Sequence, residues 1–191
     1  MVAASILPVT IHNNELYFLF GKENNMEKSA KGWSDFGGGV ESGEQIFKTA
    51  LREGAEELTG FLGNSKQLEK HIRKHGGYYH VEHNDYHVHI IFVEYDENLV
   101  KYYNNNHAFL WKKMDHSYLS KTKLFEKIEI GWFSLKNIAN MRGEFRPFYE
   151  EILDNILRHE ENIHTFISKK NRKSIKNRIS KKSKKTRKNN V

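Results

Sequence analysis

The chain has 191 residues and is 38% hydrophobic, with 12 Phe, 9 Tyr and 3 Trp, which suits one globular domain with a modest extension. The absence of Cys excludes disulfide scaffolds, zinc–thiolate sites and thiolate catalysis. No apolar run approaches the roughly 20 residues of a membrane span, and the first residues do not resemble a signal peptide. We therefore expect an intracellular protein, most simply a cytoplasmic one.

The net charge of +7 comes from one end of the chain. Residues 168–191 contain 12 Lys and Arg and no Asp or Glu, which leaves 19 basic and 24 acidic side chains in residues 1–167. We predict a globular domain over 1–167 and a disordered basic tail over 168–191, because so polar a segment buries too little apolar surface to offset its ordering entropy. The tail would attract RNA or another polyanion, or act as a nuclear-localisation signal.

Three β-rich runs precede the first predicted helix. They cover residues 3–11, 15–21 and 33–36. Asn13-Asn14, between the first two runs, is typical of a tight hairpin turn. The third run leads into Gly37-Gly38-Gly39, where a backbone without side chains can approach a ligand closely.

A helix is predicted over about 43–58. Ser42 is its expected N-cap, Gln45 would complete a capping box, and Gly60 is the expected C-terminal stop. Apolar and small residues recur along it at intervals of three and four, which predicts the face that packs on the core. These residues are Phe47, Ala50, Leu51, Gly54 and Leu58.

The second half of the chain contains two further predicted strands, over 86–95 and 128–133. A final helix is predicted from Pro147 to about Phe166. The segments 60–77 and 96–127 lack a clean period and are interpreted as loops, the second as a long connection or a lid. Strands before, between and after two main helices predict an α/β sandwich with a mixed sheet.

Three carboxylates converge within one turn of the first helix. Glu53, Glu56 and Glu57 lie at i, i+3 and i+4, and Arg52 is the only adjacent cation. A bound divalent cation would relieve the repulsion among them. Oxygen-only ligands favour Mg²⁺ or Mn²⁺ over zinc. A merely acid-rich exposed face is the alternative for Glu56 and Glu57 taken alone.

The segment around this helix resembles the Nudix box, the signature of the Nudix hydrolase family. The matching pattern is Gly38, five residues, Glu44, seven residues, Arg52-Glu53, two residues, then Glu56-Glu57. Residues 32–38 also resemble the strand-to-loop entry of that family.

Three features depart from the family pattern. Two residues instead of one separate Glu57 from Gly60, an insertion of one. Gly54 stands where the family prefers a bulky aliphatic residue. Asp35-Phe36 stands where many members have a Pro before the glycines.

The resemblance implies a Nudix-type α/β/α sandwich with a mixed β-sheet over 1–167 and a metal-dependent pyrophosphohydrolase activity. The implied roles fall into three groups: metal binding and catalysis by Glu53, Glu56 and Glu57 with the carbonyl of Gly38, support of these glutamates by Arg52 and Glu44, and phosphate contact by Gly37, Gly38 and Gly39.

Family members often take one more catalytic group from a loop Glu about six residues before a Trp. Glu126, six residues before Trp132, is our prediction for that role, and Glu129 is the alternative.

Histidines and aromatic residues leave further possibilities open. Six histidines lie between residues 71 and 89: His71, His75, His80, His83, His87 and His89. His87 and His89 share one face of a predicted strand and could be a metal pair, a phosphate contact, or simply solvated side chains. Four aromatic residues are either base-stacking platforms or core: Phe18, Trp33, Tyr79 and Tyr86.

The resemblance leaves the substrate open. The leading hypothesis is a nucleoside-diphosphate-linked substrate, and the mRNA 5′ cap is its most specific form. A diphosphoinositol polyphosphate is an alternative, since a basic tail suits either. A catalytically silent Nudix-fold module that binds RNA or a nucleotide is a different class, and the intact Arg52-Glu53 and Glu56-Glu57 argue against it. The sequence does not predict the oligomeric state.

Overall fold

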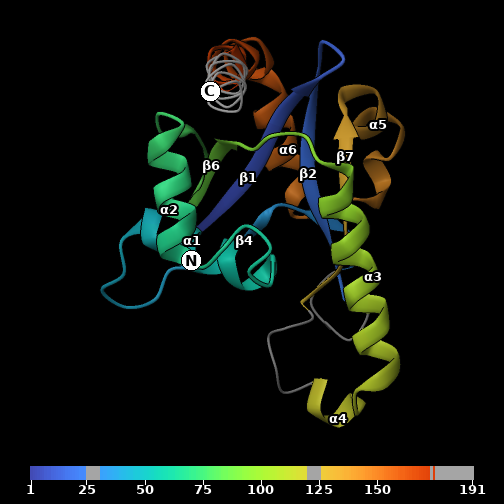
Figure 1. The fold of residues 1–191 in the computed structure, drawn as a ribbon. Coiled ribbons are helices and arrows are strands. Elements are labelled where there is room, and N and C mark those ends of the chain that lie inside the picture. Colours follow the sequence, from blue (N-terminus) through green and yellow to red (C-terminus); the bar gives the residue numbers. More distant parts are fainter. Residues whose placement is uncertain (25–30, 120–125, 173, 175–191) are drawn as a thin grey trace, which may run out of the picture.

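The computed structural model describes residues 1–24, 31–119, 126–172 and 174 (Figure 1). Its strands are β1 (Ala3–His12), β2 (Glu15–Glu23), β3 (Trp33–Ser34), β4 (Phe36–Gly39), β5 (Tyr79–His83), β6 (Tyr86–Phe92) and β7 (Lys127–Ser134). Its helices are α1 (Ile46–Glu57), α2 (Ser65–Lys74), α3 (Glu97–Lys113), α4 (His116–Leu119), α5 (Leu135–Asn140) and α6 (Tyr149–Arg158), with a 3-10 turn over Arg142–Glu144. Residues 160–172 are also helical.

The strands form one mixed sheet with helices on both faces (Figure 1). Its order is β3-β2-β1-β6-β5, with β4 paired to β1 and β7 paired to β2. On one face a buried cluster joins α1, α2 and α3 to the sheet through Leu51, Leu68, Tyr103, Ile6 and Ile130. On the other face a second cluster joins α6 and the segment 160–172 to the sheet through Ile152, Ile156, Ile167, Leu7 and Phe18. This arrangement confirms the predicted α/β/α sandwich.

Strand β1 connects β4, the glycine strand, to the rest of the sheet. Its last residues form a hairpin with β2 through Asn13 and Asn14, whose φ values of 49° and 66° fit the predicted tight turn. Its first residues pair with β4, so that Ser5 lies opposite Gly37. A Cβ on Gly37 would lie 2.3 Å from the Cβ of Ser5, so this close approach requires glycine.

The start of α1 differs from the prediction. The helix begins at Ile46, with Gln45 at the N-cap position and no side-chain cap, so the predicted Ser42 cap and its capping box are wrong. The carboxylate of Glu44, just before the helix, instead accepts a hydrogen bond from Thr49 Oγ1 at 2.7 Å. This contact ties the preceding loop to the first turn of α1.

The end of α1 explains two of the departures from the family pattern. Thr59 and Gly60 both have positive φ, at 48° and 75°, and the Gly60 N–H donates to the Ala55 carbonyl, so the predicted stop at Gly60 is confirmed. Thr59 therefore adopts the left-handed conformation at the position where the family usually has Gly. Gly54 lies against β1, where a Cβ would come within 2.4 Å of Ile6 Cδ1 and Cγ1.

The two predicted loops contain helices, and both predictions are wrong. Residues 60–77 contain α2, which begins with a capping box between Asn64 and Gln67. Residues 96–127 contain α3 and α4, although 120–125 lie outside the described residues. Asn104 of α3 pairs its side-chain amide with the backbone of Ile130, donating at 3.0 Å and accepting at 2.8 Å. Its polar side chain therefore covers the edge of β7.

The C-terminal helical region runs past the boundary predicted at residue 167. The predicted final helix is interrupted at His159 and continues over 160–172. Lys170 Nζ donates to the Gly76 carbonyl at 2.7 Å, and Asn171 Nδ2 donates to the Ile11 carbonyl at 3.3 Å. The first residues assigned to the tail therefore pack on the domain, whereas 173 and 175–191 lie outside the described residues. Among the helices described, none is both long and apolar enough to cross a membrane.

Candidate active site

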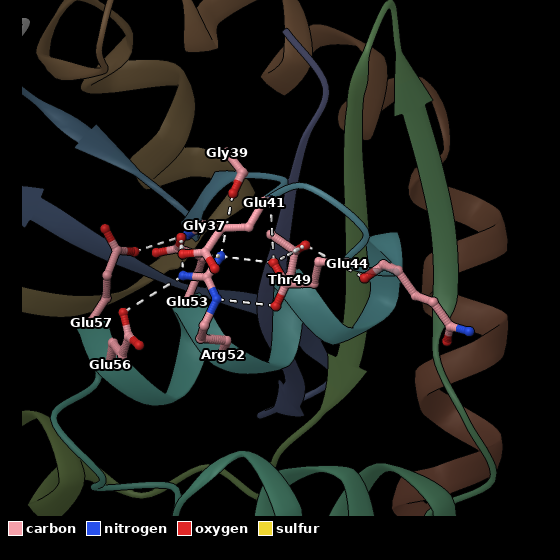
Figure 2. A network of polar contacts seen from close by, with 10 residues as sticks. Gly37, Gly39, Glu41, Glu44, Thr49, Arg52, Glu53, Glu56 and Glu57 are labelled. Atoms are coloured by element: carbon pink, nitrogen blue, oxygen red, sulfur yellow. Dashed lines mark hydrogen bonds and ion pairs between the residues drawn. The ribbon is translucent and has the colours of Figure 1, made fainter.

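The glutamates of α1 face the glycine strand β4 (Figure 2). Glu57 Oε2 accepts a hydrogen bond from the Gly37 N–H at 2.8 Å. A Cβ on Gly38 would lie 2.6 Å from the Glu53 carboxyl carbon, so the Glu53 carboxylate rests directly on the Gly38 backbone. Glu53 and Glu57 are buried, at 7% and 4% exposure. The structure thus brings together the carboxylates and glycines that the sequence predicts for one site.

Arg52 organises the outer side of this cluster (Figure 2). It donates from Nη1 to Glu53 Oε1 at 2.6 Å and from Nε and Nη2 to the two Glu44 oxygens at 3.1 and 2.9 Å. Nη2 also donates to the Gly39 carbonyl, and Nη1 lies 3.8 Å from Glu56 Oε2. Hydrogen bonding to Arg52 lowers the pKa of Glu44 to about 2. The predicted supporting roles of Arg52 and Glu44 agree with these contacts.

Lys127 is a second cation at the cluster that the sequence analysis missed. Its side chain is buried, and Nζ lies 2.5 Å from Glu23 Oε1, 2.9 Å from Ser34 Oγ and 3.4 Å from Glu57 Oε1. Burial disfavours the charged form, but Glu57 and Glu23 outweigh it and raise the pKa of Lys127. No local pattern could reveal this set, since Glu23 is 104 positions away.

Glu57 lies in the most buried and most highly charged part of the site. Burial raises its pKa well above the ordinary value; Lys127 opposes this rise, whereas Glu23, Glu126 and Glu53 add to it. Tyr103 of α3 donates to the Glu57 carbonyl at 2.7 Å and to the Lys127 carbonyl at 3.2 Å. These bonds join the end of α1 to the start of β7.

The structure places Glu126 and Glu129 differently. Glu126 is half-buried, its carbonyl accepts from the Asn24 N–H at 2.8 Å, and its charge is close enough to raise the pKa of Glu57. Glu129 pairs with Lys22 in the sheet and shares a strand face with Phe133, which packs toward α6. The geometry therefore favours Glu126 for the additional role, and the role itself stays a prediction.

Asp35 is another buried acid that the sequence analysis did not single out as functional. It accepts from Ser5 Oγ at 2.5 Å and from the Tyr86 hydroxyl at 2.6 Å, and burial raises its pKa. This network fixes the entry to β4. Tyr86 therefore serves the fold, and Phe18 and Trp33 belong to the core, so these three are not open stacking platforms.

The donor set fits a hard divalent cation. Glu53, Glu56 and Glu57 supply carboxylate oxygens, and the Gly38 backbone lies against Glu53. Oxygen donors without thiolate or imidazole are what Mg²⁺ and Mn²⁺ prefer. The excess of carboxylates, only partly offset by Arg52 and Lys127, favours a cation at this position.

A family model of the NUDIX domain matches residues 1–156, most of the chain, and the chain therefore belongs to the Nudix family. Members of this family generally use divalent metals. The fold and the site described above are therefore those of a Nudix domain.

Individual relatives are distant or partial. The uncharacterized protein L534 of Acanthamoeba polyphaga mimivirus is 46% identical over 59 residues, which cover 30% of this chain and 19% of that protein. An Ap4A hydrolase from C. elegans is similar with a TM-score of 0.44 and 13% identity, covering 82% of this chain and 94% of that one. A bifunctional NMN adenylyltransferase/ADP ribose pyrophosphatase from Francisella tularensis, complexed with AMP and a Mn ion, has a TM-score of 0.49 and 17% identity, covering 83% and 41%.

Proposed function

We propose that this Nudix protein is a hydrolase that cleaves the diphosphate linkage of a nucleoside-diphosphate-linked substrate, with Mg²⁺ or Mn²⁺ held by Glu53, Glu56, Glu57 and the Gly38 carbonyl. The observation that carries the proposal is the direct contact of two buried α1 carboxylates with the glycine backbone of β4. In such an arrangement the carboxylates can hold the cation, and the glycine backbone lets the diphosphate approach closely.

A divalent cation bound there would polarise the phosphoryl oxygens and make a bound water more acidic. The chain's own residues prepare the site for it. Arg52 holds Glu53 and Glu44 in fixed positions, so little reorganisation accompanies binding. Burial and, after it, the neighbouring carboxylates disfavour ionisation of Glu57, and a bound cation would favour its carboxylate form. Glu126 is our candidate to accept a proton from the attacking water.

The basic C-terminal end supports an RNA substrate, and the mRNA 5′ cap is the sharpest version of the proposal. A diphosphoinositol polyphosphate stays the alternative, because the same lysines suit either polyanion. The silent binding module is disfavoured, because Glu53 and Glu57 contact the glycine backbone and Arg52 bonds to Glu53.

The first experiment compares the parent protein with E53Q and E57Q on a substrate panel in the presence of Mg²⁺. The panel contains cap-labelled RNA, nucleoside triphosphates, dinucleoside polyphosphates, ADP-ribose and diphosphoinositols. We expect the variants to lose at least about 100-fold in rate, more than loss of an outer-shell partner costs. E126Q should also lose activity, whereas E129Q, on the strand face shared with Phe133, is the matched control. An E57Q variant as fast as the parent would overturn the metal assignment.

The second experiment tests the RNA version with a chain that ends at residue 174, so that the hydrogen bonds of Lys170 and Asn171 are kept. The deleted residues 175–191 contain eight Lys and Arg. We expect weaker binding of single-stranded RNA and a shallower dependence on salt, with the slope smaller by about 0.7 for each phosphate that the tail neutralises in the parent. Release of methylated guanosine diphosphate by the parent would identify the cap as substrate. An unchanged RNA affinity and slope would remove the tail from the proposal.

A further inference from the structure

A cluster of two histidines and a glutamate lies on the β5–β6 hairpin, outside the site described above. His80 and Glu82 come from β5, and His87 comes from β6, where it lies opposite Glu82 in the antiparallel register. Side chains two apart on a strand share a face, so all three point to the same side of the sheet. One ligand atom from each lies within 4.8 Å of the other two.

The distances within the cluster match the geometry of a metal site. His80 Nε2 lies 3.2 Å from His87 Nδ1, and His87 Nδ1 lies 3.5 Å from Glu82 Oε2. In a tetrahedral zinc site with bonds of about 2.0–2.1 Å, neighbouring ligand atoms are about 3.3–3.4 Å apart. The two distances from His87 Nδ1 are therefore close to the edge length of such a tetrahedron, and the third pair of ligand atoms lies within 4.8 Å.

We propose that His80, Glu82 and His87 bind a zinc-like transition-metal ion at a site distinct from the carboxylate cluster of α1. Two imidazoles and a carboxylate form a donor set that zinc uses with a fourth position left to water or an anionic group. Mg²⁺ prefers oxygen ligands, so the donor chemistry separates the two sites.

The surroundings keep the cluster ready for a metal. His80 and Glu82 are exposed and His87 is half-buried, so an ion can reach them from solvent. His89 does not join the set, because it is buried and its Nδ1 lies 3.0 Å from the Ser5 carbonyl oxygen. The sequence left open whether His87 and His89 form a metal pair, contact phosphate or are simply solvated; the structure instead groups His87 with His80 and Glu82.

The sheet register places this cluster near the phosphate loop. Gly38 pairs with Ala4, Ala4 pairs with His87, and His87 pairs with Glu82, so these residues form one row across four strands. Two strand spacings, on the order of 10 Å, separate the backbones of Gly38 and His87. The hairpin, in green beside α1 in Figure 2, would thus place a second cation on the same face of the sheet. An anionic group extending from the glycines could approach its open position.

The test is calorimetric titration of the full-length protein with Zn²⁺ in millimolar Mg²⁺, so that the carboxylate cluster is already supplied with its preferred ion. We expect one tight site in the parent protein. H80A and H87A should each weaken it at least about 100-fold, more than the loss of an outer-shell partner does, and E82Q should also weaken it. Co²⁺ should give the visible absorption bands of a four-coordinate ion in the parent and not in H87A.

Three matched variants make the result decisive. H83A changes a histidine of the same hairpin that contacts Glu151 of α6, and H75A changes the C-cap residue of α2; both should bind Zn²⁺ like the parent. E53Q should also retain zinc, because its carboxylate belongs to the other site. Thermal unfolding of the metal-free variants shows whether each is folded. The proposal is overturned if the parent binds no Zn²⁺, if folded H80A and H87A bind it like the parent, or if E53Q alone abolishes it.

Discussion

Arg52 and Lys127 both hold glutamates of α1, but the chain supplies their partners in different ways. Arg52 bonds to Glu44 and Glu53, both within eight positions, and its side chain is 21% exposed. Lys127 is 1% exposed and contacts Glu23, Ser34 and Glu57, which come from three separate elements. The comparison teaches that the outer ion pairs join residues close together in the sequence, whereas the inner ones exist only when the sheet has formed. Loss of the inner cation should therefore affect folding far more.

The largest effect is expected from K127M. Removing the buried cation leaves buried Glu57 without its neighbouring positive charge and leaves Glu23 paired with Arg146 alone, which costs about 3 kcal/mol of unfolding free energy. Urea unfolding measures it, and K70M on the exposed face of α2 is the matched control, with a change within about 0.5 kcal/mol. The double variant E23Q/K127M should be more stable than K127M. Equal losses of unfolding free energy for K127M and K70M would show that the buried cation contributes no more than an exposed one.

R52K tests whether the outer cation acts through its shape. Lysine keeps the charge but cannot bond to Glu44 through two nitrogens and to Glu53 at the same time. We expect a loss of about 2 kcal/mol, since these bonds join charged groups. R73K changes the exposed ion pair with Glu69, and it should lower the free energy of unfolding by only a few tenths of the loss expected for R52K. A parent-like stability of R52K would mean that charge alone organises the cluster.

Y103F tests the hydrogen bonds that join the end of α1 to the start of β7. Its hydroxyl bonds to the carbonyls of Glu57 and Lys127, and losing it should cost about 1–2 kcal/mol because both acceptors are buried with it. Y102F is the neighbouring control, since that side chain is 60% exposed. Equal stability of Y103F and Y102F in urea unfolding would contradict the proposed tie between α1 and β7.

The smallest effect concerns Glu44 and pH. Its pKa is about 2 in the folded protein against an ordinary 4.5, so its stabilising contribution is present above pH 4.5 and is lost as pH falls toward 2. Because the side chain is partly solvated, we expect E44Q to cost about 1 kcal/mol at neutral pH. Unfolding measured from neutral pH down to about pH 3 should show the difference between E44Q and the parent shrinking. A constant difference would show that ionised Glu44 does not matter.

The parts of the fold that sequence reasoning predicted are those with local signals. The Asn13-Asn14 turn, the strands on either side of it and the acidic helix each depend on neighbouring residues. The missed helices lack such a signal. Helix α2 has only two buried residues, Leu68 and Ile72, which are too few for a clear helical period. In α3, Asn104 bonds to the backbone at the edge of β7, a contact that no helical pattern in the sequence indicates.

The same division applies to the candidate site. The spacing of Glu53, Glu56 and Glu57 places three carboxylates on one turn wherever that helix lies. Lys127 reaches the site through the sheet register, which pairs it with Glu23 from a distant segment, and Asp35 contacts Ser5 and Tyr86 from two other strands. The predicted capping by Ser42 is wrong because the carboxylate of Glu44 bonds to Thr49 and Arg52 and anchors the first turns of α1 in its place.

The contact between Gly54 and Ile6 determines how deep α1 sits on the sheet. A side chain at residue 54 would push the helix outward, because its Cβ would come within 2.4 Å of Ile6. Glu53 and Glu57 would rise with the helix, whereas Gly37 and Gly38 would stay in the sheet. If the proposed cation binds there, Mg²⁺ demands bonds of about 2.0–2.1 Å and larger cations accept longer ones, so this apolar contact would set which ion radius the site accepts.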